Sequence, residues 1–504
     1  SKMYRYGMNY GDKSMGSLPT TIKKIQATQK PKKEMKLKNS YFSICLLLLI
    51  SLNAIGQADT ILKLSYTNFL QLVKQNHPLA KQANLITKAA DANTLSARGS
   101  FDPKLFYDFN NKFFDSKNYY QLGDGGFKIP TWFGLEFKAG YEQNQGLFLN
   151  PENTTPNQGL VYSQISLPLL QGLLIDERRA TLKQAKLFQQ LSAFEKINTI
   201  NELLYRAGKA YWDWQLSFTN LKVHQNAVNL SQDRFEAIKK TSILGDRPAI
   251  DTVEAIIQLQ DRIINLQQAQ MDYRTKSLLL SNYLWIENEV PIELTDRTIP
   301  ETELVIDKTK NILNSNISQL DSLIDFHPNL KVYDFKLKQL GIEKKFKQDK
   351  LKPNLNFNFN PLFNSENLNA GYQNNYKWGL TFGFPIFLRK ERGDLQLVKI
   401  KIENTSYETL NKRNELMNKV RLTINEFNTY NNLLAIYNKN VFDYERLWKS
   451  EIQLFSSGES SLFMINSREM SYINAQIKLN EITNKNQKSA LDVEYSLGLL
   501  NALY

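Results

Sequence analysis

The sequence predicts an α+β protein in which two long helical hairpins alternate with short two-faced strands. Three observations lead to this fold class. Proline-free stretches occur that are too long for a compact domain, strictly alternating strands lie before them, and the whole pattern recurs later in the chain.

The longest predicted helix runs from Arg178 to Leu244, a stretch rich in Lys, Gln, Leu, Ala, Glu and Asn. It contains no proline, and proline breaks helices. At 1.5 Å per residue such a helix is roughly 100 Å long. A second proline-free stretch follows Pro385 and continues to Tyr504. Helices of this length indicate a coiled coil or an extended ring of helices.

A glycine-containing turn interrupts each of these long helical stretches. "LGDRPA" (244–249) places glycine before proline, which ends one helix and starts the next. "SGESS" (457–461) marks a second turn around Gly458. We therefore expect two antiparallel hairpins with tips at Gly245 and Gly458. Coiled-coil spacing on either side of the first tip is carried by Val228, Phe235 and Ile238, and by Ile256/Ile257 and Ile263/Ile264.

An internal duplication is predicted from a repeat at an offset of 250 residues. "HPLAKQANLITK" begins at His77 and "HPNLKVYDFKLK" begins at His327. At this offset prolines, leucines and aromatic residues align, as in Pro103/Pro353, Leu105/Leu355, Tyr107/Phe357 and Phe109/Phe359. We expect a first repeat over 57–290 with strands at about 104–168, a connecting equatorial segment over 291–320, and a second repeat over 321–504 with strands at about 354–387.

The predicted strands alternate apolar and polar residues. They cover 354–361 and 376–385 in the second half, and 104–113, 131–142 and 160–167 in the first. The first half also holds two extra polar stretches, "FFDSKNYYQLGDGG" and "NQGLFLNPENTTPNQG", which we interpret as loops plus one additional hairpin. The sequence leaves open whether this hairpin enlarges the sheet or lies outside it.

Such strands fit either a soluble sheet or an outer-membrane barrel. Aromatic residues near the strand ends, together with an export signal, favour the barrel, in which the apolar face meets lipid. So few strands cannot close a barrel alone, and lipid tolerates no open edge, so several copies must contribute strands to one closed oligomer. The residues expected to face lipid are Leu355, Phe357, Phe359, Trp378, Leu380 and Phe382; those expected to face the lumen are Asn354, Asn356, Asn358 and Asn360.

The N-terminal residues 1–56 are predicted to be an extension followed by a signal peptide. Lys36 and Lys38 precede an apolar stretch from Tyr41 to Leu52, and "AIG" then fits cleavage near 56/57. Cys45, the single cysteine, lies within the apolar stretch, so no disulfide is expected. Residues 1–56 hold 10 Lys and Arg against 2 Asp and Glu, a net charge of +8. The other 448 residues hold 53 Lys and Arg against 48 Asp and Glu, a net charge of only +5. This small charge argues against nucleic-acid binding.

Motifs for catalysis, cofactors or metals are not recognisable in the sequence. His77 and His327 are repeat equivalents, each followed by proline near a helix start, and are expected to be structural. Asp176 and Glu177 stand beside two arginines at a helix start, where charge pairing is expected rather than acid–base catalysis. We therefore predict no enzyme activity, no cofactor and no metal.

The two tip motifs, "GDRPAIDTVEA" from Gly245 and "GESSLFMINSRE" from Gly458, resemble those of the TolC family of outer-membrane efflux proteins. Two strand-to-helix passages, "YSQISLPLLQGLLIDERRATLKQAKL" and "LTFGFPIFLRKERGDLQL", extend the resemblance over about residues 60–504. It implies a homotrimer in the outer membrane of a Gram-negative bacterium, with a long α-helical periplasmic barrel of coiled-coil hairpins and a shared transmembrane β-barrel. It also implies an exit duct for tripartite efflux or type I secretion, joined by a periplasmic adaptor and an inner-membrane pump.

The resemblance also implies roles for residues at the two tips. Adaptors dock at the positions of Gly245, Asp246, Arg247, Gly458, Glu459 and Ser460. Arg247 and Asp251 match positions of a charged gate, although both residues would also simply cap and solubilise a helix end. The second tip departs from the pattern: Met464 stands at the position equivalent to Asp251, and Asn466 is the nearest polar candidate.

Two other kinds of protein fit parts of the pattern. A periplasmic coiled-coil adaptor or scaffold would have the long hairpins but no membrane barrel. A surface structural protein would not take part in export. The sequence does not identify the exported substrate, the pump class, the adaptor or the number of strands in each copy.

Overall fold

The computed structural model describes residues 62–295, 297–301, 306–316, 320–365 and 375–504. The chain divides into two units, 1–60 and 61–504, and the described residues all belong to the second. The predicted signal peptide, its cleavage site and Cys45 lie outside the described residues. So do parts of the predicted connecting segment 291–320.

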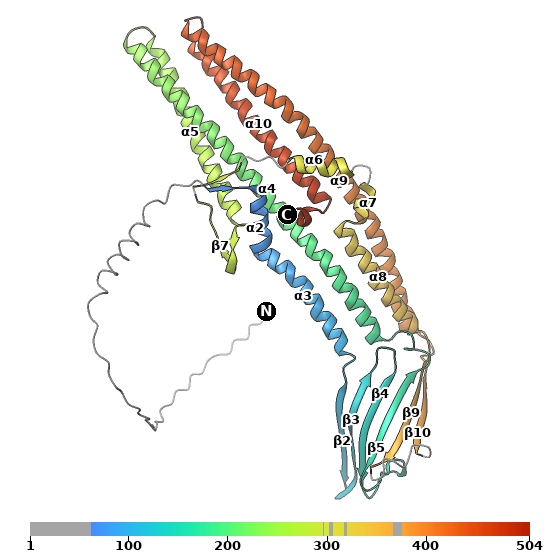
Figure 1. Cartoon of the computed structure of the whole chain (residues 1–504). Helices are drawn as coiled ribbons and strands as arrows, with labels where there is room; N and C mark the ends of the chain where they lie inside the picture. The colour runs from blue at the N-terminus through green and yellow to red at the C-terminus, as the bar shows by residue number, and fades with distance from the viewer. Residues whose placement is uncertain (1–61, 296, 302–305, 317–319, 366–374) are drawn as a thin grey trace, which may run out of the picture. The chain divides into compact units, whose positions relative to one another are not determined.

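Long helices dominate the structure (Figure 1). In the first half they are α2 (Tyr66–Asn76), α3 (Pro78–Gly99), α4 (Glu177–Ile243) and α5 (Ala249–Ser281). In the second half they are α6 (Ile306–Asn316), α7 (Leu320–Asp325), α8 (Pro328–Asp349), α9 (Arg389–Ser456), α10 (Leu462–Ser496) and α11 (Leu500–Leu503). With 67 and 68 residues, α4 and α9 each extend for roughly 100 Å. No helix in the described part of the chain combines the length and the apolar character needed to cross a membrane.

Histidine caps begin the shorter helices α3 and α8 in the same way. The Nδ1 atom of His77 accepts a hydrogen bond from the backbone N–H of Leu79, and that of His327 from Asn329, each at 3.1 Å. A proline follows each histidine at the first helical position, where its missing N–H costs nothing. The predicted structural role of both histidines is therefore observed directly.

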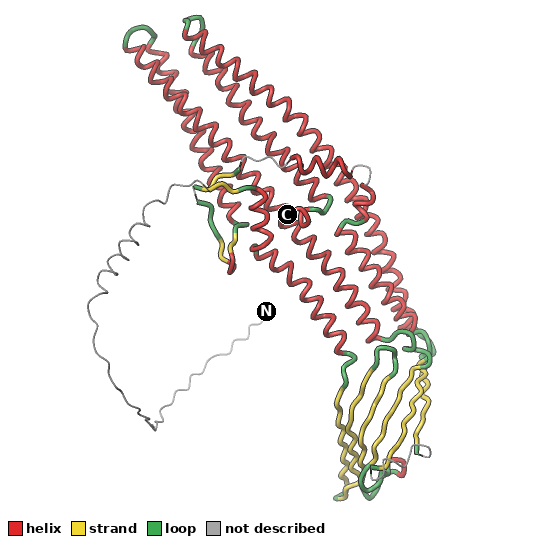
Figure 2. Tube along the Cα trace, in the orientation of Figure 1, coloured by secondary structure: helices red, strands yellow, loops and turns green. Residues whose placement is uncertain are grey.

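A six-stranded antiparallel sheet lies at the ends of these helices (Figure 2). Its strands are β2 (Lys104–Phe114), β3 (Lys117–Pro130), β4 (Glu136–Gln145), β5 (Leu160–Pro168), β9 (Asn354–Asn364) and β10 (Tyr376–Gly383), in the order β10-β9-β5-β4-β3-β2. Elsewhere β1 (Leu62–Leu64) pairs in parallel with β8 (Thr298–Pro300), and β6 (Trp285–Ile286) pairs with β7 (Val290–Pro291). Short 3-10 turns are Pro151–Asn153 and Glu287–Glu289.

The stretch "FFDSKNYYQLGDGG", one of the two that were interpreted together as loops plus one additional hairpin, is mostly strand. Asp115 and Ser116 both have positive φ, 51° and 58°, which is the geometry of a two-residue hairpin turn with the twist of the flanking strands. The chain therefore turns directly from β2 into β3. The predicted additional hairpin exists, and it is part of the sheet. Strand β4 also begins later than predicted, at Glu136, because 131–135 form a turn.

The largest apolar core joins elements that are far apart in sequence. It surrounds a cluster of fully buried aromatic residues on α4 and is closed by α2, α5 and α10. Its central members are Phe69, Leu70, Tyr211, Trp212, Trp214, Leu280 and Leu491. A second core around Val420, Phe427 and Val493 packs α9 against α10. The core members on α4 and α9 lie near the middle of these helices, far from the hairpin tips at one end and from the sheet at the other.

Candidate functional site

The two hairpin tips have the same backbone geometry. Gly245 and Gly458 have φ values of +84° and +77°, a region that favours glycine. After α4, the N–H of Asp246 donates to the carbonyl of Thr241 and that of Gly245 to Ser242. After α9 the same pattern is repeated: the N–H of Glu459 donates to the carbonyl of Leu454, and the N–H of Gly458 donates to the carbonyl of Phe455. Both helices therefore end in a Schellman motif, which explains why glycine marks each tip.

Arg247 connects the first tip to the second hairpin. Its Nη1 atom lies 3.5 Å from Oδ2 of Asp251, so these two predicted gate residues are brought together. Its guanidinium group also lies 4.0 Å from the centre of the Phe455 ring on α9, a cation–π contact. The second tip is held within its own hairpin instead, because the Ser460 hydroxyl donates to Glu451 of α9.

Asn466, the third predicted gate residue, does not contact Arg247 or Asp251. Its carbonyl oxygen accepts a hydrogen bond from Arg234 Nη1 at 3.0 Å, and its amide nitrogen donates to Glu254 Oε1 at 3.0 Å. Asn466 therefore bridges α10 to both helices of the first hairpin, about two turns inward from the tips.

A buried ionic cluster, which sequence analysis missed, adjoins Asn466. Glu469 is only 1% exposed and pairs with Arg234, while its other oxygen lies 4.0 Å from Nη2 of Arg262. Burial lowers the pKa of Arg262, which is 3% exposed, and nearby Glu469 opposes that shift. Three helices, α4, α5 and α10, each contribute a charge, so the cluster ties the two hairpins together.

A sequence signal for this cluster exists in α5. Its buried residues Ala255, Leu259 and Arg262 follow the four-and-three spacing of a helix seam. A charged residue at such a position indicates a buried partner on another helix. The isoleucines that suggested the coiled-coil spacing are mostly on the outside, since Ile257, Ile263 and Ile264 are exposed.

Large apolar side chains surround the glycine at each tip. On the first tip they are Ile243, Leu244, Ile250 and Val253, and on the second Leu454 and Phe463, all of them exposed. Leu244 and Ile243 are 75% and 77% exposed, which is unusual for residues of this size. Both tips therefore present large apolar side chains to their surroundings.

The six predicted lipid-facing residues form three cross-strand pairs on one face of the sheet. Leu355 lies opposite Phe382, Phe357 opposite Leu380, and Phe359 opposite Trp378. Trp378, Leu380 and Phe382 are each more than half exposed. The other face of the same two strands carries the asparagines, with Asn354 opposite Gly383, Asn356 opposite Thr381, Asn358 opposite Gly379 and Asn360 opposite Lys377.

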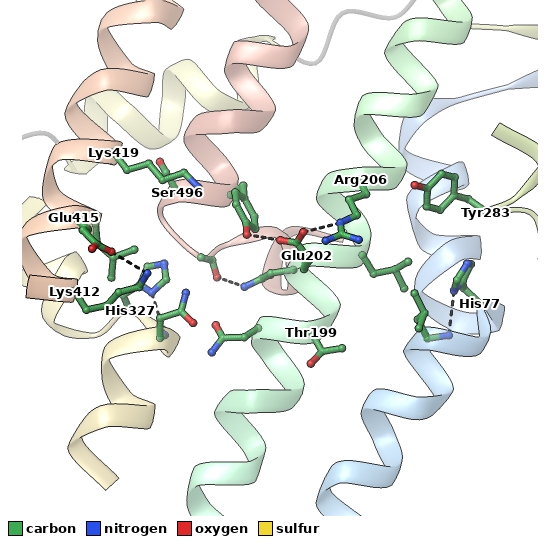
Figure 3. A pocket seen from close by; sticks show the side chains of 18 of the residues that line it. His77, Thr199, Glu202, Arg206, Tyr283, His327, Lys412, Glu415, Lys419 and Ser496 are labelled. Carbon is green, nitrogen blue, oxygen red and sulfur yellow. Dashed lines mark hydrogen bonds and ion pairs between the residues drawn. The ribbon is translucent and has the colours of Figure 1, made fainter. Parts of the chain in front are cut away.

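A pocket of about 700 Å³ lies at the middle of the helices, between the starts of α3 and α8 (Figure 3). Its carboxylates are already paired: Glu202 with Arg206 at 2.6 Å and Glu415 with Lys412 at 3.2 Å. Burial, reinforced by Lys412 and Lys419, lowers the pKa of His327 to about 4, so this histidine is neutral at pH 7. Nothing in the described residues groups three metal-binding side chains, here or elsewhere.

Comparison with known proteins gives matches in structure only. No protein-family model matches the sequence, and no curated protein matches it. The open state of the Neisseria gonorrhoeae MtrE outer membrane channel aligns with a TM-score of 0.60 at 12% identity, covering 86% of this chain and 88% of that one. The Campylobacter jejuni CmeC outer membrane channel aligns with a TM-score of 0.58 at 13% identity, covering 86% of this chain and 85% of that one.

The outer membrane protein VceC from Vibrio cholerae aligns with a TM-score of 0.58 at 11% identity, covering 86% of this chain and 96% of that one. Each of these three alignments covers 86% of this chain. The resemblance inferred from the two tip motifs is confirmed at the level of the fold. This chain has the TolC-like fold of outer membrane channels.

Proposed function

We propose that this chain is an outer-membrane exit duct, which passively conducts molecules from a periplasmic pump assembly to the outside of the cell. The observation that carries this proposal is the sheet, which has an exposed apolar face, a polar face and two edges without a neighbour among the described strands. It stands at the end of two long helical hairpins. A duct through a membrane and a periplasm needs these two parts, joined end to end.

The dimensions of the sheet support a membrane location. Strands β2 and β9 have 11 residues and β4 has 10, close to the length with which a tilted strand spans a bilayer. The exposed aromatic and aliphatic face is stable against lipid, whereas in water it would favour aggregation. The polar face, with its row of asparagines, would then line a water-filled lumen.

The free edges support a shared barrel. Among the described strands, β2 and β10 each have a neighbour on one side only. An open strand edge carries unpaired N–H and C=O groups, which lipid does not tolerate. A homotrimer would close the edges, and the repeated order of helix, strands, long helix, tip and long helix would place six similar hairpins around one tunnel, as an internal duplication predicts.

The tips support docking of a periplasmic adaptor, which would connect the duct to an inner-membrane pump. Gly245, Asp246 and Arg247 on one tip and Gly458, Glu459 and Ser460 on the other would present the turns, and the exposed apolar residues beside them would supply contact area. Arg247 and Asp251 would hold the tunnel closed, with Asn466 acting through its contacts to Arg234 and Glu254. Transport energy would come from the pump, of the RND, ABC or another class.

The second candidate function is a periplasmic coiled-coil adaptor or scaffold without a membrane barrel. The long hairpins α4–α5 and α9–α10 favour it, because such hairpins are also the working part of adaptors. The exposed apolar face of the sheet does not fit this function, since it would remain in water.

Conductance of the purified full chain in a planar lipid bilayer tests the proposal, together with fractionation of cells that express it. An exit duct should be recovered with the outer membrane and should form discrete, long-lived ion channels. Recovery in the soluble periplasm, or a purified oligomer that never conducts, would favour the scaffold. Loss of export after deletion of the gene would then identify the class of substrate.

A further inference from the structure

We infer that the barrel of this protein contains eighteen strands, and that its three seams each join β2 of one copy to β10 of the next. The inference rests on the proposed trimeric duct and adds to it the size of the barrel and the surface through which copies meet. The decisive question is whether the hairpin β2–β3 forms part of the barrel wall or lies beside it.

Hydrogen bonding places the hairpin in the wall. Strand β3 pairs with β4 over ten residues, from Gln121 opposite Gln145 to Pro130 opposite Glu136. Strand β2 pairs with β3 from Lys104 to Phe114, with a single irregularity after Lys112. Both ladders are longer than the pairing of β4 with β5, so the hairpin is a continuous part of the sheet.

The apolar face continues across the hairpin without a break. Residues in register across five strands form one apolar row: Ile129, Phe137, Ile165, Phe359 and Trp378. On the same face, Leu105 of β2 lies opposite Phe127 of β3, and Tyr107 and Phe109 follow along β2. All four of these residues are more than half exposed. A hairpin outside the barrel would have no reason to continue the lipid-facing side.

The polar face also connects the hairpin to the rest of the sheet. Asp124 of β3 accepts hydrogen bonds from Lys138 of β4 at 3.0 Å and from the Tyr162 hydroxyl of β5 at 2.6 Å. Lys128 of β3 lies 2.8 Å from Glu136, which also pairs with Arg178 at the start of α4. These bonds cross three strands, so they fix β3 in its position in the wall.

Glycines on the same face make room for this arrangement. A Cβ atom on Gly140 would lie 2.7 Å from the Tyr162 hydroxyl, and one on Gly126 would lie 2.2 Å from the carbonyl oxygen of Ala139. The Tyr162 ring therefore lies over a strand that has no side chain at that point. Such close packing is expected for a permanent part of a sheet, and glycine in a strand often marks a close approach of this kind.

The directions of the edge strands allow closure by rotation. Every neighbouring pair in the order β10-β9-β5-β4-β3-β2 is antiparallel, so the two edge strands run in opposite directions. Rotation about an axis through the membrane brings β10 of one copy beside β2 of the next, again antiparallel. This rotation also keeps every apolar face outward and every helical part on one side of the membrane. A twofold axis that paired two identical edges would not keep the helical parts on one side.

The width of the helical part agrees with eighteen strands. In each copy α3, α4, α8 and α9 lie side by side and lead directly into the sheet, which gives twelve helices in a trimer. At a spacing of about 9.5 Å, twelve helices have a circumference of about 110 Å. Eighteen strands about 4.8 Å apart and tilted by about 40° also give about 110 Å, whereas twelve such strands give about 75 Å.

Cysteine cross-linking between copies tests the seam. On a Cys45→Ser background the chain has no other cysteine. Asp108→Cys on β2 is combined in turn with Lys377→Cys, Gly379→Cys, Thr381→Cys or Gly383→Cys on β10, which sample successive registers on the polar face. Each pair is oxidised in membranes and separated on a non-reducing gel. The matched control combines Gln164→Cys on β5 with the same four positions.

We expect at least one β2–β10 pair to produce dimer and trimer bands that reduction removes, while no Gln164 pair does so. Conducting channels without any β2–β10 cross-link, or with a cross-link through Gln164, would overturn the inference and leave the proposed function standing. Absence of conducting channels would instead overturn the proposed function. A cysteine pair can impair folding, so the strands are also counted in an experimental structure of the unmodified oligomer. A barrel of twelve strands in that structure would overturn the inference.

Discussion

The two halves of this protein share their turns and helix caps but differ in their strands and in the chemistry of their tips. His77 and His327 cap their helices with the same bond at 3.1 Å, and Gly245 and Gly458 end theirs with the same motif. The first half, however, has four strands in the sheet where the second has two. Features that the backbone requires are thus repeated, while the number of strands and the side-chain contacts of the tips differ.

The difference at the tips is one of charge. The first tip has an Arg247–Asp251 ion pair and a cation–π contact to α9, and the second has a hydroxyl that bonds within its own hairpin. Between them, the buried cluster around Glu469 joins the halves.

The largest effect is expected for Glu469→Gln, which should destabilise the fold by about 3–5 kcal/mol. The substitution removes the buried carboxylate that pairs with Arg234 and faces Arg262, and it leaves the Arg262 guanidinium, whose side chain is only 4% exposed, without this partner. Thermal unfolding followed by circular dichroism at 222 nm should show a midpoint several degrees lower. Glu481→Gln, in the exposed pair with Lys478 at 2.9 Å, serves as the control and should change stability by less than about 0.5 kcal/mol. Equal shifts for both variants would contradict a structural role of the cluster.

Acid should destabilise the second half through His327. Its pKa is about 4 in the folded protein against 6.5 in the unfolded chain, so between these values only the unfolded chain binds the proton. The stabilising contribution is therefore complete above pH 6.5 and is lost as the pH falls toward 4, in total about 3 kcal/mol. His327→Asn keeps an oxygen that accepts the cap bond from Asn329 and should unfold with a weaker dependence on pH in this range.

His77→Asn provides the comparison with the first half. Burial also lowers the pKa of His77, but a backbone hydrogen bond opposes the shift, so the change in pH dependence should have the same direction and a smaller size. Unfolding midpoints measured from pH 4 to pH 7.5 for wild type and both variants show how much each histidine contributes to the pH dependence of stability. A pH dependence that is identical in wild type and His327→Asn would show that the histidine is not neutral in the folded protein.

The tips should respond equally to loss of glycine. Gly245→Ala and Gly458→Ala each force an alanine into a left-handed conformation, which costs about 1–2 kcal/mol. No atom lies within 4 Å of a Cβ at either position, so the cost is one of backbone conformation alone. Gly341→Ala in the middle of α8 is the control, and there alanine should stabilise the helix by about 0.5–1 kcal/mol. Clearly unequal costs at the two tips would mean that the turns are not equivalent.

Much of this fold could be predicted from the sequence, because its strongest features are local. The absence of proline predicted α4 and α9, and the glycine turns predicted where α4 and α9 end. Strict alternation in "PNLNFNFNP" predicted β9 and the face to which each of its residues belongs. These features depend on residues close together in the chain, so they can be read without knowledge of the partners.

Features that depend on distant partners could not be predicted. Strand β3 contains Gly123, Gly125 and Gly126, which hide its alternation, and its pairing with β4 and its bonds to Tyr162 define it. The buried charge of Arg262 has meaning only beside Glu469, more than 200 residues away. The contacts of Asn466 likewise depend on distant partners, since they are with Arg234 and Glu254.

The smallest effect on stability, but a clear effect on conductance, is expected for Asp251→Asn and Arg247→Gln. The ion pair is 3.5 Å long and partly exposed, so its loss should cost less than about 1 kcal/mol. If the pair holds the tunnel closed, either variant should open more often in a planar bilayer, at unchanged single-channel conductance. Glu459→Gln removes one negative charge from the other tip, where the ion pair joins Arg468 to Glu451 at 3.7 Å and does not include Glu459, and should leave opening unchanged. An increase for Glu459→Gln alone would place the gate in the second half, and equal increases would make net charge, rather than this contact, the cause.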